Sequence, residues 1–146
     1  MVHVEKTITV SSSIQDSFDF VADFRNLPKW NPNDESVELL TEGPLRIGSV
    51  FRIKTSINNR SLVLDYKIIE WGSTLRASFS TESKLFNAVD SVFLSAGREG
   101  TEITYAGDFE FKGFLRLIGP IYFKPILEKL FSENILNLKS YLDSSI

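Results

Sequence analysis

Side chains that commonly carry out catalysis are scarce in this sequence. It contains no cysteine and a single histidine, His3, two residues from the first position. Thiolate nucleophiles, histidine-based triads and two-histidine metal sites are therefore excluded. We expect His3 at the surface or at a strand edge, and we predict no catalytic residue, no metal and no cofactor.

Asp90 is the acid most able to do chemistry. In a strand that begins near Phe86, regular alternation places Asp90 on the same apolar face as Val92. An inward carboxylate would need a partner or a raised pKa, and it could then contact a ligand or act as a general base. A bulge or a one-residue slip would instead expose Asp90 and turn Val89 and Phe93 inward. The sequence leaves both arrangements open.

Three other polar side chains could face an interior site. Tyr66 and Tyr105 fall on the inward faces of their expected strands, where a hydroxyl could orient the polar group of an apolar ligand. The alternative is that both tyrosine tips reach water at a sheet edge. Asn134 lies on the seam of the expected C-terminal helix, where its amide could face either a cavity or solvent.

The segment before Pro32 is expected to be a connector with one short helical turn. Two prolines, Pro28 and Pro32, lie four residues apart and limit regular helix there. Asp23 precedes this turn, and we interpret it as a cap of free backbone amides rather than as a catalytic acid. Trp30 either anchors the connector against the core or forms the wall of a cavity.

Length and charge favour one domain, residues 1–146, without nucleic acid as a partner. The 146 residues can bury enough surface to fold as a single core. The 16 basic and 19 acidic residues give a net charge of -3, and the basic residues form no stripe. The sequence shows no secretory signal and no apolar stretch long enough for stable membrane insertion, which favours the cytoplasm. It does not indicate an oligomeric state.

Alternation of apolar and polar residues predicts the strands. It follows residues 2–10, 35–41 and 48–57, and after a hairpin at Asn58 and Asn59 it resumes at Leu62. Further strands are expected after a turn at 72–73, from Phe86 to Ala96 and from residues 101 to 111. Such short connections require an antiparallel meander.

Helical periodicity appears twice. Either Ser12 with Gln15 or Ser13 with Asp16 has the spacing of a capping box before the amphipathic segment that begins at Ile14. The last third has apolar residues every three or four positions from Leu127 to Leu142, which predicts a helix of about 20 residues or more. Two prolines, at 120 and 125, are expected to delay its regular part or to kink it.

Several local strings resemble the START-like SRPBCC superfamily, and within it the polyketide cyclase/dehydrase-type family. They are residues 18–23 continuing into 26–32, residues 40–45 with Gly48 and Phe51, and residues 100–105. The resemblance covers essentially the whole chain. It implies an α+β helix-grip fold, in which about seven antiparallel strands curve around a long C-terminal helix and two short helices follow the first strand.

The phenylalanine-rich inner faces predict that a small apolar or amphipathic molecule is bound or carried between the sheet and the last helix. The resemblance suggests lipid-, quinone- or polyketide-like ligands. One alternative is a cyclase or dehydratase in which Asp90 and a tyrosine move protons; we lean against an enzyme. Another is an interaction module with a filled cavity and a docking segment at residues 117–123. The candidate ligand-binding residues are Phe51, Ile53, Tyr66, Phe79, Asp90, Val92, Tyr105, Phe109, Phe131 and Asn134.

Overall fold

The structure of the protein is a computed structural model that describes residues 1–57, 59–72 and 75–144. Two of the predicted turn residues, Asn58 and Ser73, lie outside the described residues. The elements follow one another along the chain as β1 (Val2–Val10), α1 (Ile14–Val21), the 3₁₀ helix η1 (Phe24–Lys29), β2 (Asp34–Leu39), β3 (Val50–Ile57), β4 (Arg60–Trp71), β5 (Arg76–Glu82), β6 (Phe86–Gly97), β7 (Gly100–Phe111) and α2 (Leu115–Ser144).

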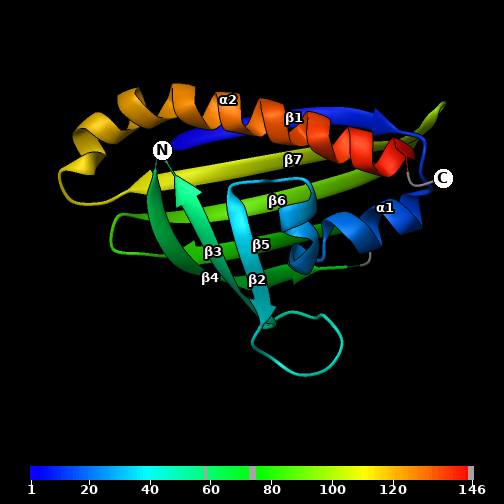
Figure 1. The fold of residues 1–146 in the computed structure, drawn as a ribbon, viewed down its shortest axis with the longest axis horizontal. Coiled ribbons are helices and arrows are strands. Elements are labelled where there is room, and N and C mark those ends of the chain that lie inside the picture. The colour runs from blue at the N-terminus through cyan, green and yellow to red at the C-terminus, as the bar shows by residue number, and fades with distance from the viewer. Residues whose placement is uncertain (58, 73–74, 145–146) are drawn as a thin grey trace.

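The described strands form one antiparallel sheet in the order β1-β7-β6-β5-β4-β3-β2. Strands β2 to β7 pair with their neighbours in sequence, whereas β1 crosses over to pair with β7. Helix α2 runs along β1 and β7 (Figure 1), α1 contacts β6 and β7, and η1 contacts β2 at the opposite edge of the sheet. This is the predicted helix-grip fold, including the two short helices after the first strand.

Alternation along β3 and β4 shows how the sheet acquires one buried face. Phe51 and Ile53 are 0% and 3% exposed, and their partners across the ladder, Tyr66 and Leu64, are 8% and 5% exposed. Arg52, between them, is exposed and pairs with an acid on the outer face. The inner face of the sheet therefore faces the helices and carries the apolar core.

Both short helices begin at candidate capping residues, and for α1 the structure selects Ser13 over Ser12. The Ser13 hydroxyl accepts a hydrogen bond from the Asp16 backbone N–H at the start of α1. The Asp23 carboxylate accepts one from the Arg25 backbone N–H at the start of η1. The capping interpretation of Asp23 is thus confirmed, since its oxygens are occupied by backbone and by the Arg25 guanidinium.

Helix α2 is 30 residues long and contains both prolines, Pro120 and Pro125. The expectation that the prolines delay the helix is wrong, because the helix begins at Leu115. Both prolines lie in the first half of the helix but after its first four residues, so each removes a backbone donor that would otherwise bond within the helix. The first turns bend away from the rest (Figure 1), which agrees with the alternative expectation of a kink. Within the described residues, no helix has the length and hydropathy needed to cross a bilayer.

Candidate functional site

A cavity of about 100 Å³ lies between the inner face of the sheet, η1 and α2. Most of its wall is apolar, and its polar groups come mainly from the segment after η1 and from the middle of the sheet. The lining residues are Lys6, Phe24, Leu27, Trp30, Asn31, Asn33, Asp34, Ile53, Thr55, Ile57, Leu64, Tyr66, Phe86, Asp90, Tyr105, Phe109, Leu127, Leu130, Phe131, Asn134 and Ile135.

Toward β7, the side chains next to Asp90 are small, whereas its neighbour on β5 is the large Phe79. In the ladder, Asp90 of β6 stands directly opposite Gly107 of β7, and Ala88 precedes it on the same face. A Cβ atom placed on Gly107 would lie 2.7 Å from Cζ of Phe131. The Phe131 ring of α2 thus takes the place of a side chain on Gly107, and the space next to it stays open.

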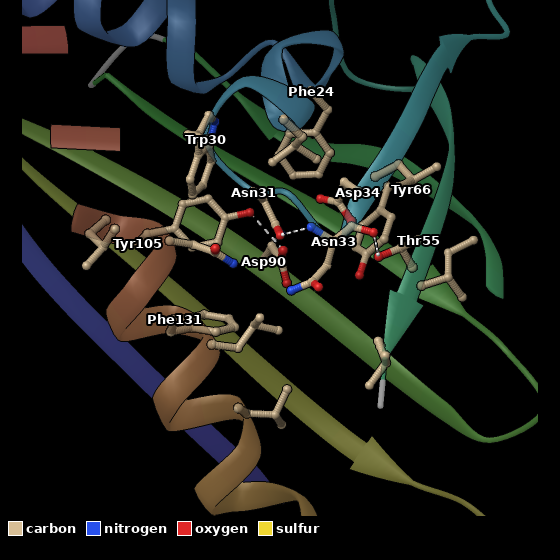
Figure 2. A pocket seen from close by; sticks show the side chains of 18 of the residues that line it. Phe24, Trp30, Asn31, Asn33, Asp34, Thr55, Tyr66, Asp90, Tyr105 and Phe131 are labelled. Atoms are coloured by element: carbon tan, nitrogen blue, oxygen red, sulfur yellow. Dashed lines mark hydrogen bonds between the residues drawn. The ribbon is translucent and has the colours of Figure 1, made fainter. Parts of the chain in front are cut away.

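Asp90 has one satisfied and one unsatisfied carboxylate oxygen. Its Oδ2 atom accepts a 2.8 Å hydrogen bond from the Tyr105 hydroxyl. Its Oδ1 atom is buried and has no hydrogen-bond partner within the described part of the chain. Figure 2 shows Asp90 near the middle of the cavity, between Tyr105 and Asn33. A buried acceptor without a partner is unusual, and it is the strongest mark of a ligand-contacting atom in this cavity.

Two carboxyl groups in the cavity have raised pKa values. Burial raises the pKa of Asp90 to about 7, which the hydrogen bond from Tyr105 opposes and the charge of Asp34 reinforces. Burial likewise raises the pKa of Asp34 to about 6, against a hydrogen bond from the Thr55 hydroxyl. Near neutral pH, Asp90 is therefore present both as the acid and as the carboxylate.

The two tyrosines supply hydroxyls that stay protonated. Burial, with the nearby charge of Asp90 second, raises the pKa of both Tyr66 and Tyr105 well above the usual value. They are 8% and 6% exposed, so the alternative in which their tips reach water at a sheet edge is wrong. The Tyr105 hydroxyl already donates its proton to Asp90 Oδ2, and the Tyr66 hydroxyl can donate a hydrogen bond within the cavity at any physiological pH.

Lys6 is the basic residue among those that line the cavity, and it already has a partner. Its ammonium lies 2.8 Å from Glu128 of α2, with the Lys6 side chain 29% exposed. The ion pair connects β1 to α2, and only the lysine is a lining residue. Asp90 and Asp34 thus share the cavity without a cation of their own among the described residues.

Seven of the ten residues proposed as ligand contacts lie in the cavity wall. They are Ile53, Tyr66, Asp90, Tyr105, Phe109, Phe131 and Asn134. The other three, Phe51, Phe79 and Val92, are not among the lining residues and are completely buried. The ring of Phe24 stacks on Phe79 at 3.8 Å and closes that part of the interior. Whether any of the ten contacts a ligand stays a prediction.

The open alternatives for the inward residues are now resolved. The β6 ladder is unbroken against both β5 and β7, so the slip that would expose Asp90 does not occur. Asn134 is 5% exposed and faces the cavity rather than solvent. Trp30 is both an anchor and a wall, because it is 4% exposed and its ring meets that of Tyr105 edge to face. His3 is exposed and bonded to Asp108 and Glu5.

Asp34 lines the cavity but was not predicted as a site residue from the sequence. Its position precedes the predicted strand, and plain alternation would place it on the outer face with Ser36. A bulge between Asp34 and Ser36 changes the register, so that Asp34 pairs with the inward Thr55. The one available signal was Thr55 itself, an inward polar residue in need of a partner across the strand pair.

The described residues contain no cluster of three or more histidine, cysteine, aspartate or glutamate side chains that could hold a metal ion. Lining residues offer two carboxylates, two hydroxyl-bearing rings and several amides. Such groups can bind and orient a polar atom or move a proton. Around them stand Trp30, Phe86, Phe109 and Phe131, which supply apolar contact area.

The chain belongs to the family described as polyketide cyclase / dehydrase and lipid transport, whose model matches residues 1–143. This confirms the resemblance noted in the sequence. No curated protein matches the chain.

Solved structures with the same fold include a START superfamily protein from Mycobacterium smegmatis. It has 21% sequence identity and a TM-score of 0.71, and the match covers 97% of this chain and 94% of that one. The Zhui aromatase/cyclase from Streptomyces sp. R1128 has 17% identity and a TM-score of 0.74, with 97% and 90% covered.

The di-domain ARO/CYC StfQ from the steffimycin biosynthetic pathway has 14% identity and a TM-score of 0.75. The match covers 97% of this chain and 50% of StfQ, so the chain spans about half the length of that protein. At these identities the likeness establishes the fold alone.

Proposed function

We propose that the protein binds a small amphipathic molecule in the cavity under α2 and carries it in solution. The main support is the buried Oδ1 atom of Asp90, which has no partner among the described residues and borders the cavity. The apolar wall would hold the body of the ligand, and Asp90 with Tyr105 would hold its polar end.

The volume of the cavity limits the size of the ligand. A dry cavity of ~150 Å³ takes up benzene, whereas drug-sized ligands occupy ~300–1,000 Å³. At about 100 Å³, this cavity suits a molecule of roughly one ring. A lipid, quinone or multi-ring polyketide would require Phe131 and α2 to move away from the sheet. The ligands suggested by the family description could therefore bind only in a conformation in which α2 lies farther from the sheet.

Binding is tested by titrating toluene and naphthalene and following the NMR signals of residues in the cavity wall. We expect saturable toluene binding to the wild type and weaker binding of the larger naphthalene. Leu130→Trp should block it, because Leu130 lines the cavity, whereas Leu136→Trp on the 59% exposed side of α2 should not. Native mass spectrometry of gently purified protein would show any retained molecule. Absence of saturable binding, or equal binding by both tryptophan variants, would exclude this function.

A second candidate function, proton transfer of the cyclase or dehydratase kind, is favoured by one observation. Asp90 has a pKa of about 7 beside a tyrosine that stays protonated, which suits a general acid or base at neutral pH. Its test is exchange of deuterium from the α-carbons of ring-deuterated cyclohexanone. Asp90→Asn should abolish catalysed exchange while the protein stays folded. Exchange at the same rate in wild type and variant would exclude Asp90 as the base.

A further inference from the structure

One oxygen of the Asp90 carboxylate lacks a hydrogen-bond donor among the described residues. The Oδ2 atom is served by Tyr105 at 2.8 Å, while Oδ1 is buried without a partner in the described part of the chain. Leaving an ionised oxygen unpaired in the interior is costly. A ligand that donates a hydrogen bond to this oxygen would therefore gain more free energy than it loses by giving up its hydrogen bond to water.

The surplus of negative charge around this oxygen points to a cation. Asp34 also lines the cavity, and both Asp34 and Asp108 act electrostatically on Asp90 in the same unfavourable direction. Lys6 does not compensate, because its ammonium is paired with Glu128. Each neutral donor would satisfy Oδ1 but leave this charge uncancelled, whereas a positive donor would do both.

Aromatic rings also border the cavity that contains Asp90. Trp30 and Phe131 both meet the Tyr105 ring edge to face, at centroid distances of 5.4 and 5.9 Å. All three rings belong to the cavity wall, on the same side as Asp90 (Figure 2). Aromatic faces attract ammonium groups, most strongly where water is excluded.

We propose that the ligand of this cavity is a small primary ammonium compound with a body of about one ring, whose charged nitrogen donates to Asp90 Oδ1. This inference rests on the proposed binding function and specifies its ligand class. The ring of such a compound would lie against the apolar wall formed by Phe109, Leu127 and Phe131. Its nitrogen would reach Asp90 Oδ1, which among the described residues of the cavity wall is the buried side-chain oxygen without a hydrogen-bond partner.

Three probes of equal ring size separate the two proposals. Toluene tests apolar binding, benzyl alcohol adds a neutral donor, and benzylammonium adds a charged one. We expect benzylammonium to bind wild-type protein about ten- to hundredfold more tightly than toluene at pH 8, as for a hydrogen bond to a charged group. Benzyl alcohol should fall between them.

The failures of the two proposals are distinguishable. If none of the three probes binds, the cavity function itself fails. If toluene or benzyl alcohol binds as well as benzylammonium or better, the cavity function stands and the ammonium preference is overturned. The comparison uses the wild-type protein and needs no variant.

Two variants then test whether the preference for benzylammonium depends on Asp90. Asp90→Asn should remove the preference for benzylammonium while toluene still binds, and Asp34→Asn, the matched neutralisation, should retain it. If instead Asp34→Asn removes the preference and Asp90→Asn retains it, the assignment to Asp90 is overturned. Toluene binding reports that each variant is folded.

Dependence on pH supplies an independent readout. The groups that face Asp90 are Tyr105 on β7, Asp34 on β2 and Tyr66 on β4, and α2 presents the neutral amide of Asn134. The charge of Asp108 on β7 also acts on Asp90. Asp90 gains a proton as the pH falls below about 7 and then no longer offers an anionic acceptor. Benzylammonium affinity should fall about tenfold or more from pH 8 to pH 5, and toluene affinity should not. A flat profile for benzylammonium would contradict the proposal.

Discussion

Two neighbouring parts of the interior differ in packing: side chains fill one of them, and the other contains the cavity. At one part, Phe24 of η1 packs against Phe51 and Phe79, all three fully buried, and the Phe24 ring stacks on Phe79 at 3.8 Å. At the other, Asp90 and Gly107 lie under Phe131, which is only half-buried, and a cavity stays open. Phe79 and Asp90 are direct neighbours in the sheet.

The difference is made by the element that covers the sheet. The short helix η1 stacks the Phe24 ring on Phe79 of β5 and places it at a tilt against Phe51 of β3, which fills the space over these two side chains. Helix α2 is held away from Asp90, with its amide Asn134 and the ring of Phe131 facing the gap. Packing in a sheet-and-helix core is thus decided by the partner side chains of the covering element as much as by the sheet.

The largest expected effect on stability comes from removing a phenylalanine ring in the closed part of the interior, where side chains fill the space. Phe79→Ala should lower the free energy of unfolding by about 3–5 kcal/mol, because it deletes a completely buried ring with little room to collapse. Phe131→Ala should cost about 1–2 kcal/mol, since that ring is half-buried beside existing space. Urea denaturation of both variants measures the contrast. Equal losses would contradict the distinction between the two parts.

A smaller effect concerns the pH dependence of stability in the open part. The pKa of Asp90 is about 7 when folded, against 3.8 for its ordinary value. Its contribution to stability is complete below the ordinary value and is lost as the pH rises through about 7, because ionisation favours the unfolded chain. Asp90→Asn should therefore gain roughly 1–3 kcal/mol relative to wild type between pH 4 and pH 8.

Denaturant midpoints of the two proteins across this pH range test that gain. Asp34 contributes in the same direction between 3.8 and about 6, and it is present in both proteins, so the comparison isolates Asp90. Parallel pH profiles for wild type and Asp90→Asn would mean that the carboxyl group is solvated in the folded protein.

The smallest expected effect on stability is that of Gly107→Ala. The new methyl group would press on the rings of Phe131 and Phe109, which can move into the cavity, and a strand residue with a side chain restricts the unfolded chain. We expect a net change below about 1 kcal/mol but a loss of toluene binding as the cavity fills.

Gly119→Ala is the matched control for this prediction. Its added Cβ would lie 2.8 Å from the Phe111 ring, a comparable crowding, yet neither residue lines the cavity. Toluene titrations should show normal binding for this control. Retained binding in Gly107→Ala would mean that Phe131 moves elsewhere.

Most of the fold could be predicted from the sequence because it depends on local periodicity. The alternation at Phe51, Ile53 and Thr55 predicts the face of β3, and the spacing from Leu127 to Leu142 predicts α2. The residues that border the cavity are harder to predict than the fold, because local periodicity does not identify them. Phe79 and Asp90 share one face, and which of them borders a cavity depends on the ring that η1 places above the sheet.

Asp34 could not be predicted for a different reason. The bulge that turns it inward is a one-residue irregularity, and neither Asn33 before it nor Glu35 after it marks its position, so the inward Thr55 across the strand pair is the only signal. Carboxylates are ordinarily expected outside, so alternation alone assigns Asp34 to the wrong face.

The pairing of β1 with β7 also governs how the protein folds. His3 and Asp108, which are bonded across these strands, are 105 positions apart in the chain. The hairpins from β3 to β7 can form from local contacts, but β1 must wait for β7, and closing so long a loop is entropically costly. Helix α2 contacts β1 more than any other strand. The cavity should therefore be assembled in the last and slowest phase of folding, after the meander has formed.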